Sequence, residues 1–419
     1  MRPEFAMKSY LFAAAAFAAA SFAANAQMAP SGAAQGAAPA APPAAAATPP
    51  PLPPPVPFDQ ALLLAANDLF TKANLRGDAP SPVALAIDPL IDGNTGMQSA
   101  ATQSMGRRIT ELVRKDFPRY RIEPFSTATV AKSPLILVGT FTPISLTGKN
   151  DGPRDAFRVC LALLDLGSGK IISKGFARAT PEGIDHAPVA FFNDSPVWTT
   201  DPSTQAYIKS CQGTKAGDPI NQAYADRVLA GAFISDAINA YNGGKYKDAI
   251  GLYQSALKTP GGDQLRTHNG IYLTSLRLNR KKEAADAFAK VVDAGLENKS
   301  LAVKFLFKPG STQLYTPSKT NSQPYAMWVS TIAAKAAARN SCLEVVGHTS
   351  ATGPEPINVR LSTLRAEMIK DRIEGRAPTL SKRLIANGVG SKEVLVGTRK
   401  DDASDALDRR VEFKVIGAC

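Results

Sequence analysis

The sequence predicts an α+β protein with several domains, and three observations support this fold class. Its 419 residues are enough for two or three domains. Beyond a segment of Ala, Pro, Gly and Gln at 27–57, short apolar runs alternate with helical patterns. A later stretch repeats itself with an offset of 35 residues. We therefore expect a small α/β domain over 58–215, a short helical unit over 221–298 and a further domain over 301–419.

The N-terminus has the pattern of an export signal. Met7 and Lys8 precede an apolar run, and Ala24-Asn25-Ala26 has the small residues of a cleavage site. We expect a signal peptide over 1–26, followed by an extended tether over 27–57. No later segment reaches the ~18 apolar residues that a membrane span needs, so none is expected in the mature chain. The sequence therefore predicts a periplasmic protein associated with the cell wall or outer membrane.

The net charge of +12 bears on the partner. Nucleic acid is a poor candidate in an exported compartment, and the basic residues are dispersed rather than clustered with aromatics. Two interpretations stay open: attraction to an anionic wall or membrane surface, or surface charge that keeps the chain soluble.

The first domain should alternate strands and helices. We expect helices over 58–73 and 97–117, separated by a buried strand at 83–87 and a turn at 92–96. Further strands are expected in this domain, at 120–125, 135–141, 157–166 and 171–177, the last two as a hairpin. The element order, and nothing else, is similar to LpoB and to the N-terminal part of TolB. Residues 190–220, which contain several prolines and glycines, are expected to be irregular.

The helical unit contains two related segments. Ala249 and Tyr253 have counterparts at Ala284 and Phe288, and each pair precedes the end of a helical pattern. This resembles tetratricopeptide repeats over 225–298, in which a small residue lets helices approach and an aromatic fills the gap. About three repeats are usually needed for stability, so this unit should lean on a neighbouring domain or a partner. It could be a helical spacer or a peptide-binding groove.

The chain has four cysteines, an even number that favours disulfides in an oxidising compartment. Three pairings are possible. We favour Cys160 with Cys211 and Cys342 with Cys419, because each bond then falls within one domain. Zinc is the weaker interpretation, since no Cys-x-x-Cys occurs and the three histidines lie far apart in sequence. We expect no metal and no cofactor.

The most informative segment runs from Gly347 to Ala366. A strand-like run leads into a polar, Gly-containing loop and then a helix that carries Arg365, a geometry suited to binding an anion. The block Gly-His-Thr…Gly…Asn…Leu-Ser-x-x-Arg-Ala resembles OmpA-like peptidoglycan-binding domains of the OmpA C-terminal and Pal type. The resemblance covers 301–417 and implies a βαβαβ domain. It implies that Phe305–Phe307 is the first strand and that Asp408–Phe413 forms the closing one.

The same resemblance implies a binding site. Peptidoglycan stems carry diaminopimelate, whose free end has an ammonium and a carboxylate. Arg365 would bind the carboxylate, Leu361 would contact the peptide, Asn358 would support the loop and Arg410 would orient the site. The family's acidic residue after Gly-His-Thr is replaced here by Ser350.

Ser350 decides how much of the family's peptidoglycan binding can be expected of this chain. Ser350 can accept a hydrogen bond from an ammonium but brings no charge, so binding could weaken by about 10- to 100-fold. Glu355 is the nearest acid that could substitute for it. His348 could suggest catalysis, but the resemblance implies a packed residue that orders the turn.

These observations give a leading hypothesis and an alternative. The leading one is a non-enzymatic periplasmic scaffold that binds peptidoglycan through its C-terminal domain and an envelope protein through the other two. The alternative is an adaptor that has lost diaminopimelate binding and contacts a protein or another glycan. No catalytic residues are expected, because no Gly-x-Ser-x-Gly, His-Glu-x-x-His or P-loop motif occurs. Asp88 and Asp92 follow a strand, where α/β domains often place ligands. Asp92 is, however, expected to start a turn and Asp165 to end a hairpin strand.

Overall fold

The computed structural model describes residues 52–75, 82–150, 154–197, 200–308, 310–314, 324–395, 404–417 and 419. The expected signal peptide and the first part of the expected tether, up to residue 51, lie outside these ranges. The end of the tether lies along the first sheet, where Val56 bridges Ala179 and its N–H bonds the carbonyl of Arg178 at 3.0 Å.

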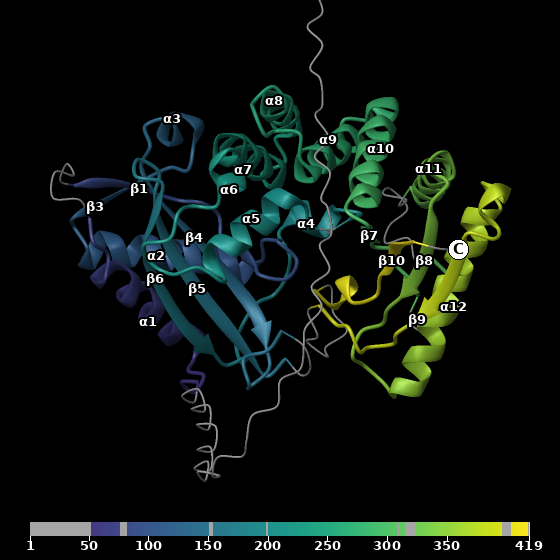
Figure 1. Ribbon diagram of the computed structural model, residues 1–419, viewed down its shortest axis with the longest axis horizontal. Coiled ribbons are helices and arrows are strands. Elements are labelled where there is room, and N and C mark those ends of the chain that lie inside the picture. The colour runs from purple at the N-terminus through teal and green to yellow at the C-terminus, as the bar shows by residue number, and fades with distance from the viewer. Residues whose placement is uncertain are drawn as a thin grey trace, which may run out of the picture. The chain divides into compact units, whose positions relative to one another are not determined.

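The first domain is a mixed sheet with helices on both faces (Figure 1). The sheet order is β3-β1-β4-β5-β6, and β2 pairs with β4. The strands β1, β2, β3 and β4 pair in parallel, whereas β4, β5 and β6 pair antiparallel. The strand bounds are β1 Val83–Ile87, β2 Ile91–Asp92, β3 Tyr120–Glu123, β4 Leu135–Ile144, β5 Ala156–Asp165 and β6 Lys170–Ala179. All ten residues of β4 are buried, as expected for a strand covered on both faces.

The helices of this domain form two layers. They are α1 Phe58–Thr71, α2 Ala100–Asp116, α3 Thr127–Val130, α4 Ala190–Asp194, α5 Pro202–Cys211 and α6 Gln222–Ala225. α1 and α2 share one apolar core with one face of the sheet, and α3, α5 and α6 share another core with the opposite face. Ser99 starts α2 through a capping box with Thr102, which fixes where the long loop after β2 ends.

The expectation that residues 190–220 are irregular is wrong. This segment contains α4 and the ten-residue helix α5. The Asp201 side chain accepts the N–H of Thr204 at 2.8 Å, and Pro202 occupies the first turn. Proline is favoured at that position because its fixed φ suits the helix and its missing N–H is not needed there.

Both disulfides join residues within one domain. Cys160 on β5 is bonded to Cys211 at the end of α5, with Cα atoms 6.0 Å apart. Cys342 is bonded to Cys419, and their Cα atoms are 5.4 Å apart. The last strand ends at Ile416, so Cys419 follows the sheet rather than ending it.

The 35-residue repeat is present in the backbone as two helical hairpins. They consist of α7 Val228–Asn242 with α8 Tyr246–Leu257, and α9 Leu265–Arg277 with α10 Lys281–Glu297. Gly244 and Asn279, 35 positions apart, both have positive φ, at 73° and 57°. The next N–H in each hairpin bonds a carbonyl five residues earlier at 2.8 Å. The tetratricopeptide resemblance itself stays a prediction, as does the likeness of the first domain to LpoB and TolB.

Gly270 gives a first testable prediction. A Cβ on Gly270 of α9 would lie 2.2 Å from the ring of the fully buried Tyr253 on α8. Gly270→Ala should therefore lower the free energy of unfolding by about 1–3 kcal/mol, because the ring has no room to move aside. Gly251→Ala is the matched control, since nothing lies within 4 Å of its Cβ position and alanine favours the helix. Urea denaturation checks both variants, and equal stability for the two would contradict the packing argument.

The C-terminal domain follows the order β7, α11, β8, α12, β9, β10, so one more strand follows the expected βαβαβ pattern. Its sheet has the order β7-β10-β8-β9, with only β8 and β9 parallel. The elements are β7 Ser300–Val303, α11 Tyr325–Ala338, β8 Cys342–Gly347, α12 Glu355–Glu374, β9 Leu384–Gly388 and β10 Val411–Ile416, with short 3₁₀ turns at Pro378–Leu380 and Ser404–Leu407. α12 packs on β8 and β9 (Figure 1).

Two strand expectations shift by a few residues. The first strand is Ser300–Val303 rather than Phe305–Phe307, because the ladder with β10 pairs Val303 with Val411. Phe305 and Phe307 still enter the core, and Phe307 bridges Leu314 across the turn. The last strand begins at Val411, after the Asp-Arg-Arg sequence.

The helical unit and the C-terminal domain share one apolar core. Trp328 of α11 stacks on Phe288 of α10 with ring centroids 5.9 Å apart, and its indole N–H bonds the hydroxyl of Tyr272 at 2.7 Å. Lys335 and Arg339 of α11 form ion pairs with Asp293 at 2.6 and 3.1 Å. The helical hairpins thus pack against a neighbouring domain, as the small number of repeats predicts. Within the described ranges, no helix has the length and apolar character to cross a membrane.

Candidate functional site in the C-terminal domain

The candidate site is the loop that joins β8 to α12. Two glycines allow it, because the helix backbone passes close to the ends of both parallel strands. A Cβ on Gly347 would lie 2.1 Å from the carbonyl oxygen of Ser362, and one on Gly388 would lie 2.2 Å from the nitrogen of Thr363. Neither position can take a larger residue without moving the helix.

The loop itself is held from several sides. The Asn358 side chain donates to the carbonyl of Thr352 at 3.0 Å. The N–H of Thr349 bonds the carbonyl of Gly390 at 2.9 Å, which ties the loop to the segment after β9. Gly353 has a φ of 83°, a conformation that favours glycine. Ser350 is buried in this loop, and its hydroxyl lies 3.1 Å from that of Thr352.

Arg365 lies in a covered position. Its side chain is only 2% exposed, and its guanidinium lies 4.7 Å from the ring centre of Phe307. Its Nε donates to the carbonyl of Ser311 at 3.2 Å and one terminal nitrogen to that of Lys308 at 3.4 Å. The arginine therefore also holds the segment after β7 in place, a contact that the sequence did not predict.

Glu355 is engaged elsewhere in the loop cluster. Its carboxylate accepts the N–H of Ser391 at 3.2 Å and also bonds the Ser391 hydroxyl. A Cβ on Gly390 would lie 2.3 Å from the same carboxylate. The acid that could have replaced the missing aspartate thus joins the start of α12 to the segment after β9.

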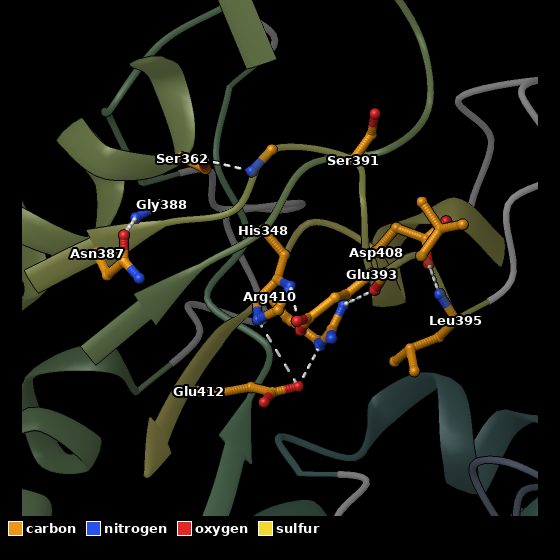
Figure 2. A network of polar contacts seen from close by, with 12 residues as sticks. His348, Ser362, Asn387, Gly388, Ser391, Glu393, Leu395, Asp408, Arg410 and Glu412 are labelled. Atoms are coloured by element: carbon orange, nitrogen blue, oxygen red, sulfur yellow. Dashed lines mark hydrogen bonds and ion pairs between the residues drawn. The ribbon is translucent and has the colours of Figure 1, made fainter. Parts of the chain in front are cut away.

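His348 is buried and lies among the charged side chains of Glu393, Arg410 and Glu412 (Figure 2). Its ring is 1% exposed, with nitrogens 3.9 Å from a carboxylate oxygen of Glu393 and 3.8 Å from one of Glu412. Arg410 donates to Glu412 at 2.7 Å and to the carbonyl of Glu393 at 3.1 Å. Burial, with the positive charges of Arg410 and Lys414, lowers the pKa of His348 to about 2. The ring is therefore a neutral packed residue, as expected, and is poorly suited to catalysis near pH 7.

The comparison with protein families agrees with this geometry. The model of the OmpA family matches residues 306–407. Residues 306–407 are an OmpA-family domain. A comparison with curated proteins found no match.

Solved structures similar to the OmpA-family domain include the peptidoglycan-associated lipoprotein from Burkholderia pseudomallei. It has 18% identity over 30% of this chain and 95% of that chain, with a TM-score of 0.24. Others are the cell wall anchor of the T6SS from Pseudomonas aeruginosa (20% identity, 28% and 80% coverage, TM-score 0.23) and the periplasmic domain of Helicobacter pylori MotB (16% identity, 28% and 75% coverage, TM-score 0.23).

In the C-terminal domain the five candidate residues lie in two groups. Ser350, Asn358, Leu361 and Arg365 belong to the β8–α12 loop and the first turns of α12, with Leu361 half-buried. Arg410 immediately precedes β10 and contacts the network around His348. Ile357 and Leu364 flank Leu361 on α12 and are exposed, so the helix presents an apolar surface beside the loop.

Sequence reasoning missed two further groups in the OmpA-family domain. The hydroxyl of Ser362 accepts the N–H of Gly390 at 2.9 Å and so holds the segment after β9 beside the site. Glu412 lies in β10, Val411–Ile416. The sequence signal that could have indicated its role is a charged residue between two apolar residues of a strand. Such a charge is buried only when it is paired, as it is here with Arg410.

The acids noted in the first domain have different roles. Asp92 accepts the N–H groups of Asn94 and Thr95 and therefore starts a turn, as expected. Asp165 ends β5 and accepts the N–H of Gly167 in the hairpin turn. Asp88 follows β1 and lines a cavity. The described part of the chain has no group of three or more His, Cys, Asp or Glu side chains placed to hold a metal ion.

Proposed function

We propose that this protein is a non-enzymatic envelope protein of the periplasm that binds peptidoglycan through its OmpA-family domain. The observation that carries the proposal is the family match over 306–407, together with a rigid β8–α12 loop that has the family's Gly-His-Thr and Leu-Ser-x-x-Arg residues in place. Export by a signal peptide and association with the wall or outer membrane are parts of the same proposal.

In this proposal Arg365 binds the carboxylate at the free end of diaminopimelate. The bond must replace those that Arg365 makes to the carbonyls of Lys308 and Ser311. Such an exchange is favourable, because an ionised acceptor forms a stronger, bidentate bond with a guanidinium than a carbonyl does. Ser350 accepts a hydrogen bond from the ammonium, Leu361 contacts the stem peptide and Arg410 supports the site from β10.

The replacement of the acid by Ser350 makes the expected affinity low. A hydrogen bond from an ammonium to a hydroxyl lacks the charge of a carboxylate, so the loss is about 10- to 100-fold. Glu355 does not restore it, because its carboxylate is bonded to Ser391. This favours a weak anchor, and it also motivates a second candidate: an adaptor whose OmpA-family domain binds a protein or another glycan.

The role of the remaining domains is a further part of the proposal. The first domain and the helical hairpins would hold an envelope protein partner while the OmpA-family domain holds the wall. Two weak contacts on one chain give a much tighter overall attachment when both engage together. The tightly packed core of the hairpins and the C-terminal domain supports a fixed geometry between the two contacts.

Co-sedimentation with diaminopimelate-type sacculi tests the proposal on the full mature chain. The native protein should pellet, and Arg365→Lys should weaken binding by about tenfold or more, because lysine cannot form the bidentate bond. Arg360→Lys, an exposed position on the same helix, is the matched control. Ser350→Asp should tighten binding by about 10- to 100-fold.

The other outcomes separate the candidates. Pelleting by Ser350→Asp alone would favour the adaptor over the wall anchor. If neither the native chain nor Ser350→Asp pellets, peptidoglycan is not the ligand of this domain.

A further inference from the structure

The first domain has a crevice that the proposed function does not use. β1 lies between β3 and β4 and is parallel to both. The chain leaves β1 through α2 on one face and passes from β3 to β4 through α3 on the other. When connections leave neighbouring parallel strands on opposite faces, a crevice opens at the carboxyl ends of those strands. Asp88 is the first residue after β1.

A cavity of about 50 Å³ lies at this crevice. Its polar lining comes from four different regions of the chain: Asp88 with Gln98, Ser203 with Tyr207, Tyr224 with Arg227 and Ser235, and Gln264 with Arg266. Such a volume holds roughly three to five water molecules, which is close to the size of the head group of an amino acid. The walls combine charged, amide and hydroxyl groups with apolar side chains such as Val228 and Ile238, so a small ligand with charged groups can be oriented there.

The cavity has one carboxyl group, that of Asp88, and two guanidinium groups, those of Arg227 and Arg266. Arg227 donates to the carbonyl of Ala223 at 3.0 Å, and in the described part of the chain no salt bridge joins Asp88 to either arginine. Asp88 accepts a bond from the Tyr224 hydroxyl at 2.8 Å, and no described residue donates to its other oxygen. Arg266 donates to the hydroxyl of Thr204 at 2.9 Å, and within the described ranges no carboxylate oxygen lies within 4.0 Å of its nitrogens. Both side chains are partly buried, so each has lost some of its hydration.

We propose that this cavity binds the head group of an α-amino acid, with the ammonium on Asp88 and the carboxylate on Arg266. A single opposite charge would leave either Asp88 or Arg266 without a counter-ion, whereas a zwitterion satisfies both. Gln98 and Gln264 supply further hydrogen bonds from either side. The cavity lies between the first domain and the helical hairpins, which supply Gln264 and Arg266, so the inference stands or falls independently of wall binding by the OmpA-family domain.

A neighbouring groove shows where the rest of such a ligand can lie. A hollow of about 500 Å³ shares Pro89 and Gln98 with the cavity and runs along α2. Arg107, Glu111 and Arg114 line it, a net positive set, so a chain attached to the head group can carry a negative charge. Two sources therefore offer this chemistry: a free amino acid, or the amino-acid end of a larger molecule such as a wall fragment.

Binding should also depend on pH. Burial raises the pKa of Asp88 to about 7. An ammonium binds the ionised carboxylate, so binding should release a proton from Asp88 and tighten as the pH rises from 6 to 8. Tyr224, Tyr207 and Arg266 are the other titratable groups that act on Asp88 and its neighbours.

Isothermal titration calorimetry of the full mature chain at pH 8 tests the proposal. The probes are glycine, D-alanine and meso-diaminopimelate, with methylamine and acetate as half-ligands. We expect at least one amino acid to bind and both half-ligands to bind far more weakly. Asp88→Asn and Arg266→Gln should each weaken binding by about 10- to 100-fold. Asp116→Asn, an exposed carboxylate at the end of α2, is the control and should bind as the native chain does.

The probes also distinguish the two sources. Binding of glycine or D-alanine supports a free amino acid. Binding of diaminopimelate alone supports a wall fragment only if Asp88→Asn removes it, because the OmpA-family domain is proposed to bind the same compound. The proposal is overturned if none of the three binds, or if Asp88→Asn binds as tightly as the native chain.

Discussion

Trp328→Ala is expected to lower the free energy of unfolding by about 3–5 kcal/mol, as large-to-small changes of buried tryptophan do. The indole is fully buried and contacts rings from two domains: Phe288 of the helical hairpins, and Phe305 and Tyr325 of the OmpA-family domain. Because all of them belong to one core, the loss should spread to both sides. Hydrogen exchange should show weaker protection of α9 and α10 as well as of α11 and β8.

Milder variants separate the packing of Trp328 from its hydrogen bond. Tyr272→Phe keeps the aromatic contact but leaves the indole N–H without its partner, which should cost about 1–3 kcal/mol. If Trp328→Ala changes hydrogen exchange only in the C-terminal sheet, the two domains unfold separately. That result would remove the argument that the hairpins depend on their neighbour.

Much of the fold could be read from local patterns. Apolar periodicity predicted the long helices, and the continuous apolar run at 135–141 predicted the fully buried strand β4. The motif from Gly347 to Ala366 placed the loop, and the offset between Ala249 and Ala284 placed the hairpins. In each case the signal lies within one segment and does not depend on its partners.

The errors concern features that a distant segment decides. Phe305–Phe307 looks like a strand, yet the ladder with β10 places the strand at Ser300–Val303. The prolines near α5 read as breakers, although Pro202 starts a helix that Asp201 caps. Apolarity and proline content alone do not report which neighbour supplies hydrogen bonds.

The candidate site shows the same limit. The family resemblance predicts that Arg365 binds a ligand, and its present partners include carbonyls 54 and 57 positions earlier in the chain. Asp88 is a similar case, because its hydrogen-bond partner Tyr224 lies 136 positions later. Residue type and spacing point to such side chains, and only the folded chain shows which groups compete for them.

Asp88→Asn should make the chain more stable at pH 8 than the native protein and have little effect at pH 4. Burial raises the pKa of Asp88 to about 7, well above the ordinary value of 3.8. A raised pKa means that the folded state holds the proton more tightly than the unfolded state. The native chain is therefore stabilised below pH 4 and loses that stability as the pH rises to about 7. Asparagine cannot ionise, so the difference between the variants should grow by up to on the order of 4 kcal/mol.

Tyr224→Phe provides the opposite test of the same carboxyl. The Tyr224 hydroxyl bonds Asp88 at 2.8 Å and favours its ionised form, so removing it should raise the pKa of Asp88 further. The stability of Tyr224→Phe should then fall with the same limiting slope as that of the native chain but go on falling to a higher pH. Urea unfolding at half-unit steps from pH 4 to 8 measures all three chains. If the free energies of unfolding of Asp88→Asn and the native chain differ by the same amount across this range, Asp88 is ionised throughout. The cavity would then hold a permanent negative charge instead of one that a ligand's ammonium induces.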